Sequence, residues 1–283
     1  MNRVMNPVES ARLPEIAPRA ATVAGWKSIL AIAGVVIKEL YRRKDFYVLF
    51  VLTALITLIM GSVNIFNQEN IVRYLKEICL FLIWAASLVI SITTTARQIP
   101  AERENRTLFP LLAKPVARHQ LLLGKFFGCW LASGVSLAWF YLFLGAVAGV
   151  KEHQWPVLNY CQALTLHWFM LGMVCALTLL GSIVFAAPSS NTTIMLVVTV
   201  GVLLMGRHLH KVALKLGEPS QTLLSTIYFA IPHLELFDVR DLLIHNWGLI
   251  RWDIWAAGLG YGAVYSALFL MLACLLFRRQ AIH

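Results

Sequence analysis

Long apolar stretches recur along this chain, and they constrain its fold more than any other feature. A helix needs roughly 20 mostly apolar residues to cross the hydrocarbon of a bilayer. Five stretches meet this requirement: Phe46–Phe66, Ile78–Ala96, Phe126–Val150, Cys161–Ala187 and Ile254–Phe277. A sixth, Ser189–Gly206, is marginal in length and begins directly after Pro188, as a helix N-terminus often does. We therefore predict an all-α membrane protein with six transmembrane helices, which form a single domain over residues 46–279.

The composition and the placement of charge agree with this prediction. Hydrophobic residues make up 59% of the chain and charged residues 13%, whereas soluble domains are about half apolar and about a quarter charged. The net charge of +10 comes from Lys and Arg that flank the apolar runs, which disfavours nucleic acid as a partner. With both termini in the cytoplasm, sixteen of these basic residues lie inside and eight outside. This asymmetry favours an N-in, C-in topology.

The N-terminal region before the first apolar run divides into two parts. Residues 1–22 mix Pro, Ala and charges and are expected to form a loose cytoplasmic tail. Within residues 23–45, helical spacing gathers the apolar side chains on one face and leaves Lys27, Lys38 and Arg42 elsewhere. No cleavage site follows, which argues against a signal peptide. We predict an amphipathic interfacial helix in the cytoplasmic headgroup layer and favour it over a buried span.

A second apolar segment, Thr222–Phe237, lies between the fifth and sixth predicted spans. It is broken by Pro232 and is too short to cross the bilayer twice. Backbone of this kind survives at membrane depth where it packs on protein or lines a wet cavity. A re-entrant segment and an external cap therefore both remain open.

The sequence carries no recognisable catalytic or metal motif. The Gly124–Lys125 pair is followed by Phe126, so the phosphate-binding pattern G-x-x-x-x-G-K-[ST] is absent. The five cysteines show no metal spacing, and His167, inside the fourth span, is expected to be satisfied by a neighbouring helix. The six predicted spans contain no Asp, Glu, Lys or Arg, which disfavours an ion-coupled carrier. We expect a protein that is not an enzyme, binds no metal or cofactor, and receives its energy from elsewhere.

The segment between the second and third spans, Gln98–Gly128, interleaves charges with leucines. A short helix from Glu102 to Leu112 would place Leu108, Leu111 and Leu112 near one face, and Pro115 would end it. Its first-turn carboxylates complement the helix dipole, and Arg118 and Lys125 are expected at the headgroup boundary. Such a helix suits docking on a soluble partner. The alternative is a solvated loop that merely supplies inside-positive charge.

This segment resembles a signature of bacterial ABC-exporter permeases with an N-terminal elbow helix and six spans. Their pattern, roughly E-x-E-x-x-T-x-x-x-L-L-x-x-P-V-x-R and then L-x-G-K-x-x-G, matches from Glu102 to Gly128. The stretch IPHLELFDVRD, Ile231–Asp241, is similar to a Pro-containing stretch before the last span of those permeases.

The resemblance implies a coupling helix that sits in a cleft of a separate ATPase subunit, which would carry the ATP and Mg²⁺. The residues implied in this coupling are Glu102, Arg103, Glu104, Arg106, Thr107, Leu108, Leu111, Leu112, Lys114, Pro115, Arg118, Gly124 and Lys125. It also implies a second permease copy. The pairs Gly145 with Gly149 and Gly258 with Gly262 have a small-residue spacing that would allow helices of two copies to approach closely. The expected location is the cytoplasmic membrane of a bacterium.

The resemblance implies an ATP-driven exporter but no substrate. Two other functions stay open. One is an ATP-driven membrane subunit for assembly or mechanical work, and the other is an unrelated membrane enzyme or secondary carrier.

Overall fold

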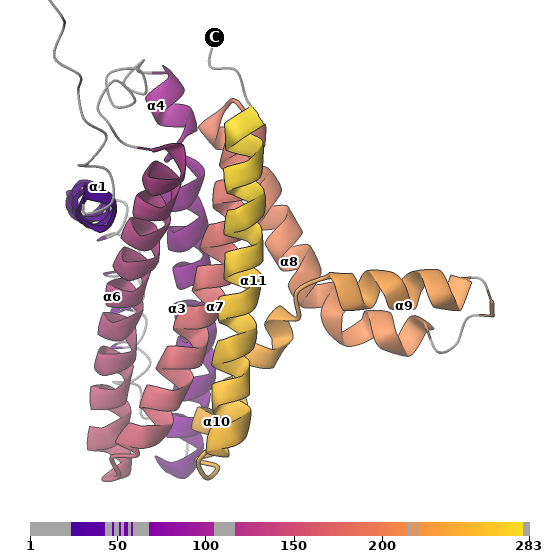
Figure 1. Ribbon diagram of the computed structural model, residues 1–283. Helices are drawn as coiled ribbons and strands as arrows, with labels where there is room; N and C mark the ends of the chain where they lie inside the picture. The colour runs from indigo at the N-terminus through magenta and orange to yellow at the C-terminus, as the bar shows by residue number, and fades with distance from the viewer. Residues whose placement is uncertain are drawn as a thin grey trace, which may run out of the picture.

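The computed structural model describes residues 24–42, 47, 51, 54–55, 58, 68–104, 117–213, 217–218 and 220–279. Within these residues the chain is helical and contains no strand (Figure 1). In chain order the elements are α1 (Ala24–Tyr41), α3 (Gln68–Ala96), α4 (Pro100–Glu104), α6 (Arg118–Glu152), α7 (Val157–Val184), α8 (Pro188–Ala213), α9 (Ser220–Ala230), the 3₁₀ helix η1 (Leu234–Phe237), α10 (Arg240–Ile244) and α11 (Trp252–Arg279).

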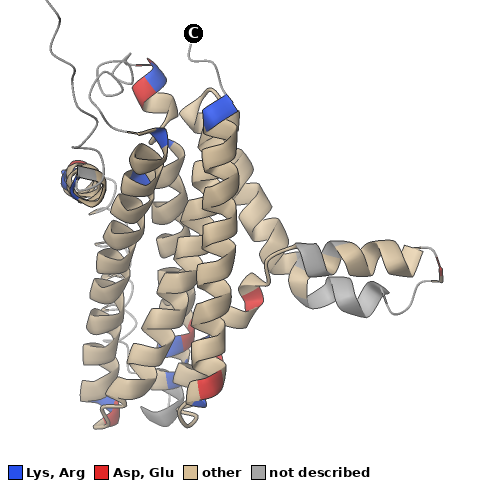
Figure 2. Cartoon of the chain, in the orientation of Figure 1, with Lys and Arg blue, Asp and Glu red and all other residues tan. Residues whose placement is uncertain are grey.

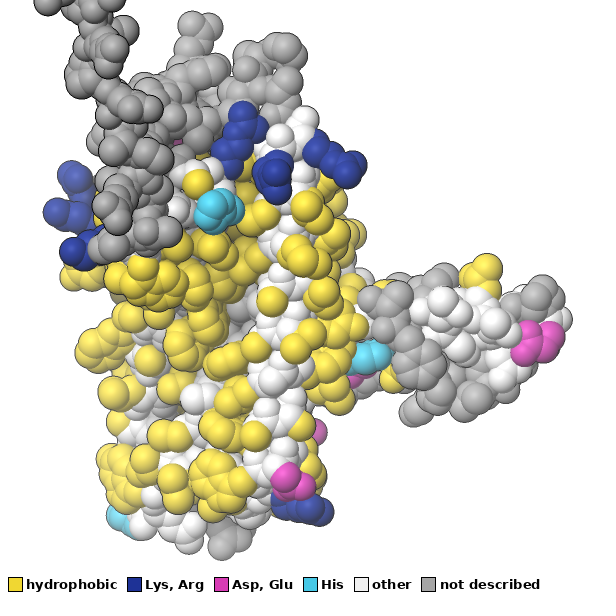
Figure 3. Space-filling model, viewed as in Figure 1, with side chains coloured by type: hydrophobic (Ala, Val, Ile, Leu, Met, Phe, Trp, Pro, Cys, Tyr) yellow, Lys and Arg dark blue, Asp and Glu magenta, His cyan; other side chains and the backbone are white. Residues whose placement is uncertain are grey.

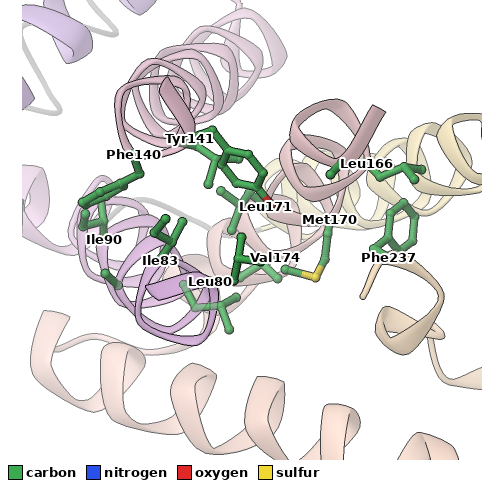
Figure 4. Packing of buried hydrophobic residues seen from close by; sticks show 14 of the residues in the cluster. Leu80, Ile83, Ile90, Phe140, Tyr141, Leu166, Met170, Leu171, Val174 and Phe237 are labelled. Atoms are coloured by element: carbon green, nitrogen blue, oxygen red, sulfur yellow. The ribbon is translucent and has the colours of Figure 1, made fainter. Parts of the chain in front are cut away.

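Four long helices form the body of the molecule and confirm four of the predicted spans. α3 with α4, α6, α7 and α11 are each long and apolar enough to cross a membrane. They run side by side, with α7 between α3, α6 and α11. In Figure 4, side chains such as Ile83, Phe140 and Val174 from three of these helices meet between the ribbons. Apolar packing between helices therefore holds the bundle together.

The outer surface of the bundle is also apolar. In Figure 3, hydrophobic side chains cover the visible face, and most of the charged ones gather toward its two ends. Trp139, Leu142 and Val264 are more than half exposed. A bundle that is apolar both inside and outside is expected where lipid replaces water as the solvent.

Helix α1 runs across the bundle rather than along it, and Figure 1 shows it nearly end-on beside α6. Its buried residues Ile29, Ala33, Val36 and Leu40 repeat at helical spacing and face α6. A helix is thus present where the amphipathic interfacial helix was predicted, and its place in the headgroup layer stays a prediction.

The fifth predicted span, Ser189–Gly206, lies within helix α8, which begins at Pro188 and ends at Ala213. Among the described residues its apolar stretch is Pro188–Leu204, and whether α8 crosses a membrane stays a prediction. It leaves the bundle and forms, with α9, a hairpin that points sideways from about the middle of the bundle (Figure 1). We call the part of this hairpin beyond Leu203, which the structure describes at residues 204–213, 217–218 and 220–230, the arm.

Other sequence predictions fall wholly or partly outside the described residues. These are the N-terminal tail, most of the first span and the segment from Asn105 to Val116. The apolar Thr222–Phe237 segment is split between the arm and η1, which returns to pack on α7 and α8. Among the described residues this segment is therefore helical but not one continuous helix, and a re-entrant segment and an external cap both stay predictions.

The small-residue pairs that suggested a dimer contact are largely covered by the chain itself. A Cβ added to Gly149 would lie 2.8 Å from Trp155, and one added to Gly262 would lie 3.2 Å from Phe237. These glycines allow close packing inside one chain, and a contact with a second copy there stays a prediction.

Candidate functional site at the α4 end of the bundle

The turn between α3 and α4 is built by local sequence. The α3 helix ends at Ala96, and the Gln98 amide donates to the Thr95 carbonyl at 3.1 Å. Ile99 is fully buried and anchors the turn. Pro100 then opens α4, where its missing N–H is no loss, and Glu102 lies in the first turn. The turn therefore holds α4 against the end of the bundle.

A buried ion pair joins α4 to α6. The Lys125 ammonium lies 2.7 Å from Glu102 Oε1 and donates to Gln98 Oε1 at 3.2 Å. Lys125 is 3% exposed and is therefore held inside the protein, while its predicted depth at the headgroup boundary stays a prediction. A lysine is almost never fully buried without a partner, and Glu102 supplies it. The pair links the two sides of the segment 105–116, because one partner precedes that segment and the other follows it.

Two arginines extend this network to the ends of the other long helices. Arg118 Nη1 donates to the Phe277 carbonyl of α11 at 2.9 Å, and its guanidinium lies 5.7 Å from the Phe277 ring centre. Arg103 Nη1 donates to the Ile183 carbonyl of α7 at 3.4 Å. The last carbonyls of a helix lack partners within the helix, and cationic side chains there are favourable. The two arginines therefore tie α4 and the start of α6 to the ends of α7 and α11.

Two glycines on α6 form the surface on which α1 packs, which we call the seat of α1. A Cβ added to Gly124 would lie 3.0 Å from the Ile29 carbonyl, and one added to Gly128 would lie 3.0 Å from the Ala33 carbonyl. Both would also lie within 2.7 Å of α1 side chains, Ile32 and Val36 respectively. Spaced four residues apart, the two glycines share one face of α6. They let the backbones of the two helices approach closely.

The structure thus brings together part of the predicted site. Glu102 and Arg103 on α4, and Arg118, Gly124 and Lys125 on α6, belong to one connected cluster, and Glu104 is exposed beside it. The remaining members, Arg106, Thr107, Leu108, Leu111, Leu112, Lys114 and Pro115, lie outside the described residues.

One comparison with known proteins identifies a family for this chain. The family model described as ABC-2 family transporter protein matches residues 29–281, and therefore all but the two ends of the chain. The chain belongs to the ABC-2 transporter family. The family and the apolar helices together make this a multi-pass membrane protein. None of the curated proteins compared with it matches.

This ABC-2 protein has a second polar group inside the bundle, which the sequence alone did not reveal. Arg240 makes two hydrogen bonds to Asp238, at 2.7 and 2.9 Å, and its guanidinium lies 5.1 Å from the Trp84 ring centre and 5.9 Å from that of Phe81. Trp84 is well inside α3, about 18 Å along the helix axis from Ala96. The stretch IPHLELFDVRD contains both residues, but it lies between two predicted spans, so its position offered no reason to place these charges inside the bundle.

His167 is hydrogen-bonded inside the bundle, as expected. Its Nε2 lies 3.0 Å from Ser87 Oγ, and its Nδ1 lies 3.3 Å from the Tyr141 hydroxyl. Partners on α3 and α6 therefore satisfy both ring nitrogens. Among the described residues, no group of three His, Cys, Asp or Glu is arranged to hold a metal ion.

Proposed function

We propose that this chain is the membrane-spanning permease subunit of an ATP-binding-cassette exporter. A separate ATPase subunit would bind ATP and Mg²⁺ and hydrolyse the ATP, and the permease would convert that work into transport. The observation that carries the proposal is the cluster at the α4 end, in a chain of the ABC-2 family. Through Glu102, Arg103, Arg118 and Lys125, the two flanks of the segment 105–116 contact the ends of α6, α7 and α11.

The cluster offers a way for motion of a partner subunit to reach the long helices. A partner that moves the segment 105–116 would also move α4 and the start of α6, since these flank it directly in the chain. The buried Glu102–Lys125 pair resists separation of the two flanks, because a lone charge left there would lack a partner. The flanks would then move as one body and carry the ends of the long helices with them.

The proposed orientation places both termini and the α4 end in the cytoplasm of a bacterium, on the inner side of its cytoplasmic membrane. Helix α1 would lie in the headgroup layer there. Outside its contact with α6 it exposes Leu30 and Val35, which are apolar, beside Lys27 and Lys38. Apolar and basic side chains on one exposed helix surface suit the boundary between acyl chains and anionic headgroups.

Co-purification with the ATPase from the same operon or genome tests the proposal. We expect Glu104→Lys, and the double variant Leu111→Asp with Leu112→Asp, to insert normally but to retain less than about a tenth of the ATPase, a loss of about 1.4 kcal/mol or more. Asp253→Lys reverses an exposed acidic charge at the opposite end of the bundle and is the matched control.

Normal ATPase binding and normal substrate-stimulated hydrolysis by the leucine variant would contradict the coupling role. The loop alternative makes a different prediction. There, neutralising Arg106, Lys114 and Arg118 would invert the topology, and the leucine changes would have no effect.

A further inference from the structure

A slot lies beside α1, between α3 and α6. It is a cavity of about 170 Å³ lined by the last turns of α1, the end of α3 and the middle of α6. Ile37 and Leu40 of α1 and Ile90 of α3 contribute apolar walls. On the α6 wall, Val135 and Trp139 are 58% and 56% exposed, so the slot is open on this side. It is therefore accessible from outside the described helices.

The hydroxyl groups in the slot already donate hydrogen bonds. Thr93, Thr94, Ser133 and Ser136 line it, and each hydroxyl donates to a backbone carbonyl of its own helix at 2.7 or 2.8 Å. A water molecule in a cavity needs about two to four polar partners, and hydroxyls that already donate offer few. The body of the slot therefore suits an apolar ligand better than water.

The end of the slot nearest α4 is basic. Among the wall residues that the structure describes, Arg97 alone is charged, and it is exposed in the turn after α3. Lys38 and Arg42 of α1 are exposed, and each adjoins a wall residue in the chain, Ile37 and Tyr41 respectively. Figure 2 shows that the charges of the long helices gather toward the two ends of the bundle. The slot therefore joins an apolar body to a basic end.

A second cavity adjoins this basic end. It measures about 490 Å³, shares Thr93 and Arg97 with the slot, and has Ser189, Thr192 and Thr193 of α8 on its other side. Its walls carry hydroxyl groups, whereas most of the slot is lined by apolar side chains. The two spaces together match the two parts of an amphiphile, because the slot accepts a chain and the adjoining cavity a headgroup.

The length of the slot matches one leaflet of a bilayer. Gln98, which follows Arg97 in the chain, accepts a hydrogen bond from Lys125 of α6 at 3.2 Å. Trp139, at the other end of the slot, lies about 21 Å further along α6. One leaflet contributes about 15 Å of hydrocarbon, half of the bilayer core. A lipid whose headgroup lies at Arg97 can therefore place its chain along the slot.

We propose that the slot binds one acyl chain of an anionic phospholipid from the cytoplasmic leaflet, and that the phosphate of this lipid pairs with Arg97. A guanidinium offers paired donors that match phosphate oxygens. The basic side chains at this end disfavour the added cation of a zwitterionic headgroup. The proposal rests on the proposed function, which supplies the cytoplasmic orientation of the α4 end. The bound lipid joins α1 to the end of α3, close to the segment 105–116.

Native mass spectrometry of the permease in complex with its ATPase tests the site. The complex is supplied with phosphatidylglycerol or with phosphatidylcholine, and one phosphatidylglycerol per permease chain is expected to stay bound at collision energies that remove phosphatidylcholine. Ala132→Leu places a larger side chain in the slot and is expected to lower phosphatidylglycerol retention at least tenfold. Ala138→Leu, at an exposed position of α6 outside the slot, is the matched control and is expected to retain the lipid.

A second variant tests recognition of the headgroup. Arg97→Gln is expected to lower retention of phosphatidylglycerol to that of phosphatidylcholine. Arg279→Gln, which removes an exposed arginine of α11 at the same end of the bundle, is expected to leave retention unchanged. Equal phosphatidylglycerol retention by Ala132→Leu and the wild type overturns the proposal, and so does equal retention of the two lipids by the wild type.

Photo-crosslinking identifies the occupant of the slot directly. With p-benzoyl-phenylalanine in place of Val135, irradiation in the membrane is expected to give a lipid adduct. An adduct within residues 46–66 of the same chain would make the first predicted span the occupant and overturn the proposal. The ATPase is weighed in the same spectra as the lipid. A wild-type permease that keeps phosphatidylglycerol but never binds the ATPase would contradict the proposed function and leave the lipid site standing.

Discussion

At the scale of single residues, a buried lysine at each end of the bundle joins neighbouring helices through an ion pair. Lys125 does so beside α4, and Lys76 does so at the opposite end. Lys76 is fully buried, lies 2.7 Å from Glu152 Oε2, and donates to Asn246 Oδ1 at 2.8 Å. Asn246 has a φ of 51°, a left-handed conformation that asparagine tolerates better than most residues. The three side chains join the start of α3, the end of α6 and the turn after α10.

Removing one partner of this group should cost much more than removing an exposed lysine nearby. Lys76→Met leaves the Glu152 carboxylate, 17% exposed, without its cation, and loss of about 3 kcal/mol of unfolding free energy is expected. For a chain of this size that lowers Tm by on the order of 5 to 10 °C. Thermal unfolding in detergent measures it, and Lys151→Met, an exposed lysine at the same end, is the control. Equal Tm values for the two variants would show that Lys76 has no such role.

At the scale of elements, α1 and α6 approach each other closely at the α4 end. The approach depends on Gly124 and Gly128, because an added Cβ at either position would lie only 3.0 Å from a carbonyl oxygen of α1. Trp26 also meets Phe127 edge-on, with ring centres 6.3 Å apart. Because α1 crosses the bundle, these contacts set its height and direction relative to α6.

Filling the seat should release α1. Gly128→Val places two methyl groups where Val36 and the Ala33 carbonyl now lie, so α1 is expected to shift away and expose the chain around Lys38 and Arg42. Trypsin cleavage there, measured in detergent micelles, should become at least tenfold faster. Gly34→Ala on α1 itself is the control, because a Cβ at Gly34 meets nothing within 4 Å. A cleavage rate equal to that of the wild type would mean that the glycines do not hold α1.

Elements that are determined by the local sequence pattern could be predicted, whereas those determined by packing between distant residues could not. The four long helices and the apolar face of α1 were predictable, because length and periodicity of apolar residues report them directly. The direction of α8 was not. Asn191 Nδ2 donates to the Ala96 carbonyl at 3.1 Å, and Gly181 allows α8 to start close against α7. These contacts join residues far apart in the chain, so hydropathy along α8 does not contain them.

The burial of Lys125 was missed for a related reason. A lysine just before an apolar run is typically assigned to the headgroup layer by hydropathy. Its position here depends on Glu102, which the turn at Gln98 to Ile99 brings back against α6. The motif residues were found from the sequence, but which of them pair with each other required the fold.

At the scale of the whole molecule, the charge distribution favours the topology that the proposed function needs. The α4 end carries basic residues on α1, α6 and the end of α11, whereas the opposite end mixes Arg251 with Asp253 and Lys76 with Glu152. Over the whole chain the predicted inside has sixteen Lys and Arg against eight outside. An excess of basic residues marks the cytoplasmic side, because such residues are retained there during insertion.

Cysteine labelling in cells measures this topology. Gly248, in the exposed turn before α11, and His283, at the C-terminus, are each replaced by Cys in a Cys161→Ala background, since Cys161 is itself exposed. A membrane-impermeant maleimide is expected to label Gly248→Cys in intact spheroplasts and His283→Cys after permeabilisation. The same reagent should reach Asn105→Cys after permeabilisation alone, because that residue follows α4. Labelling of His283→Cys in intact spheroplasts would place the ATPase and the α4 end on opposite sides of the membrane, and no coupling between them would then be possible.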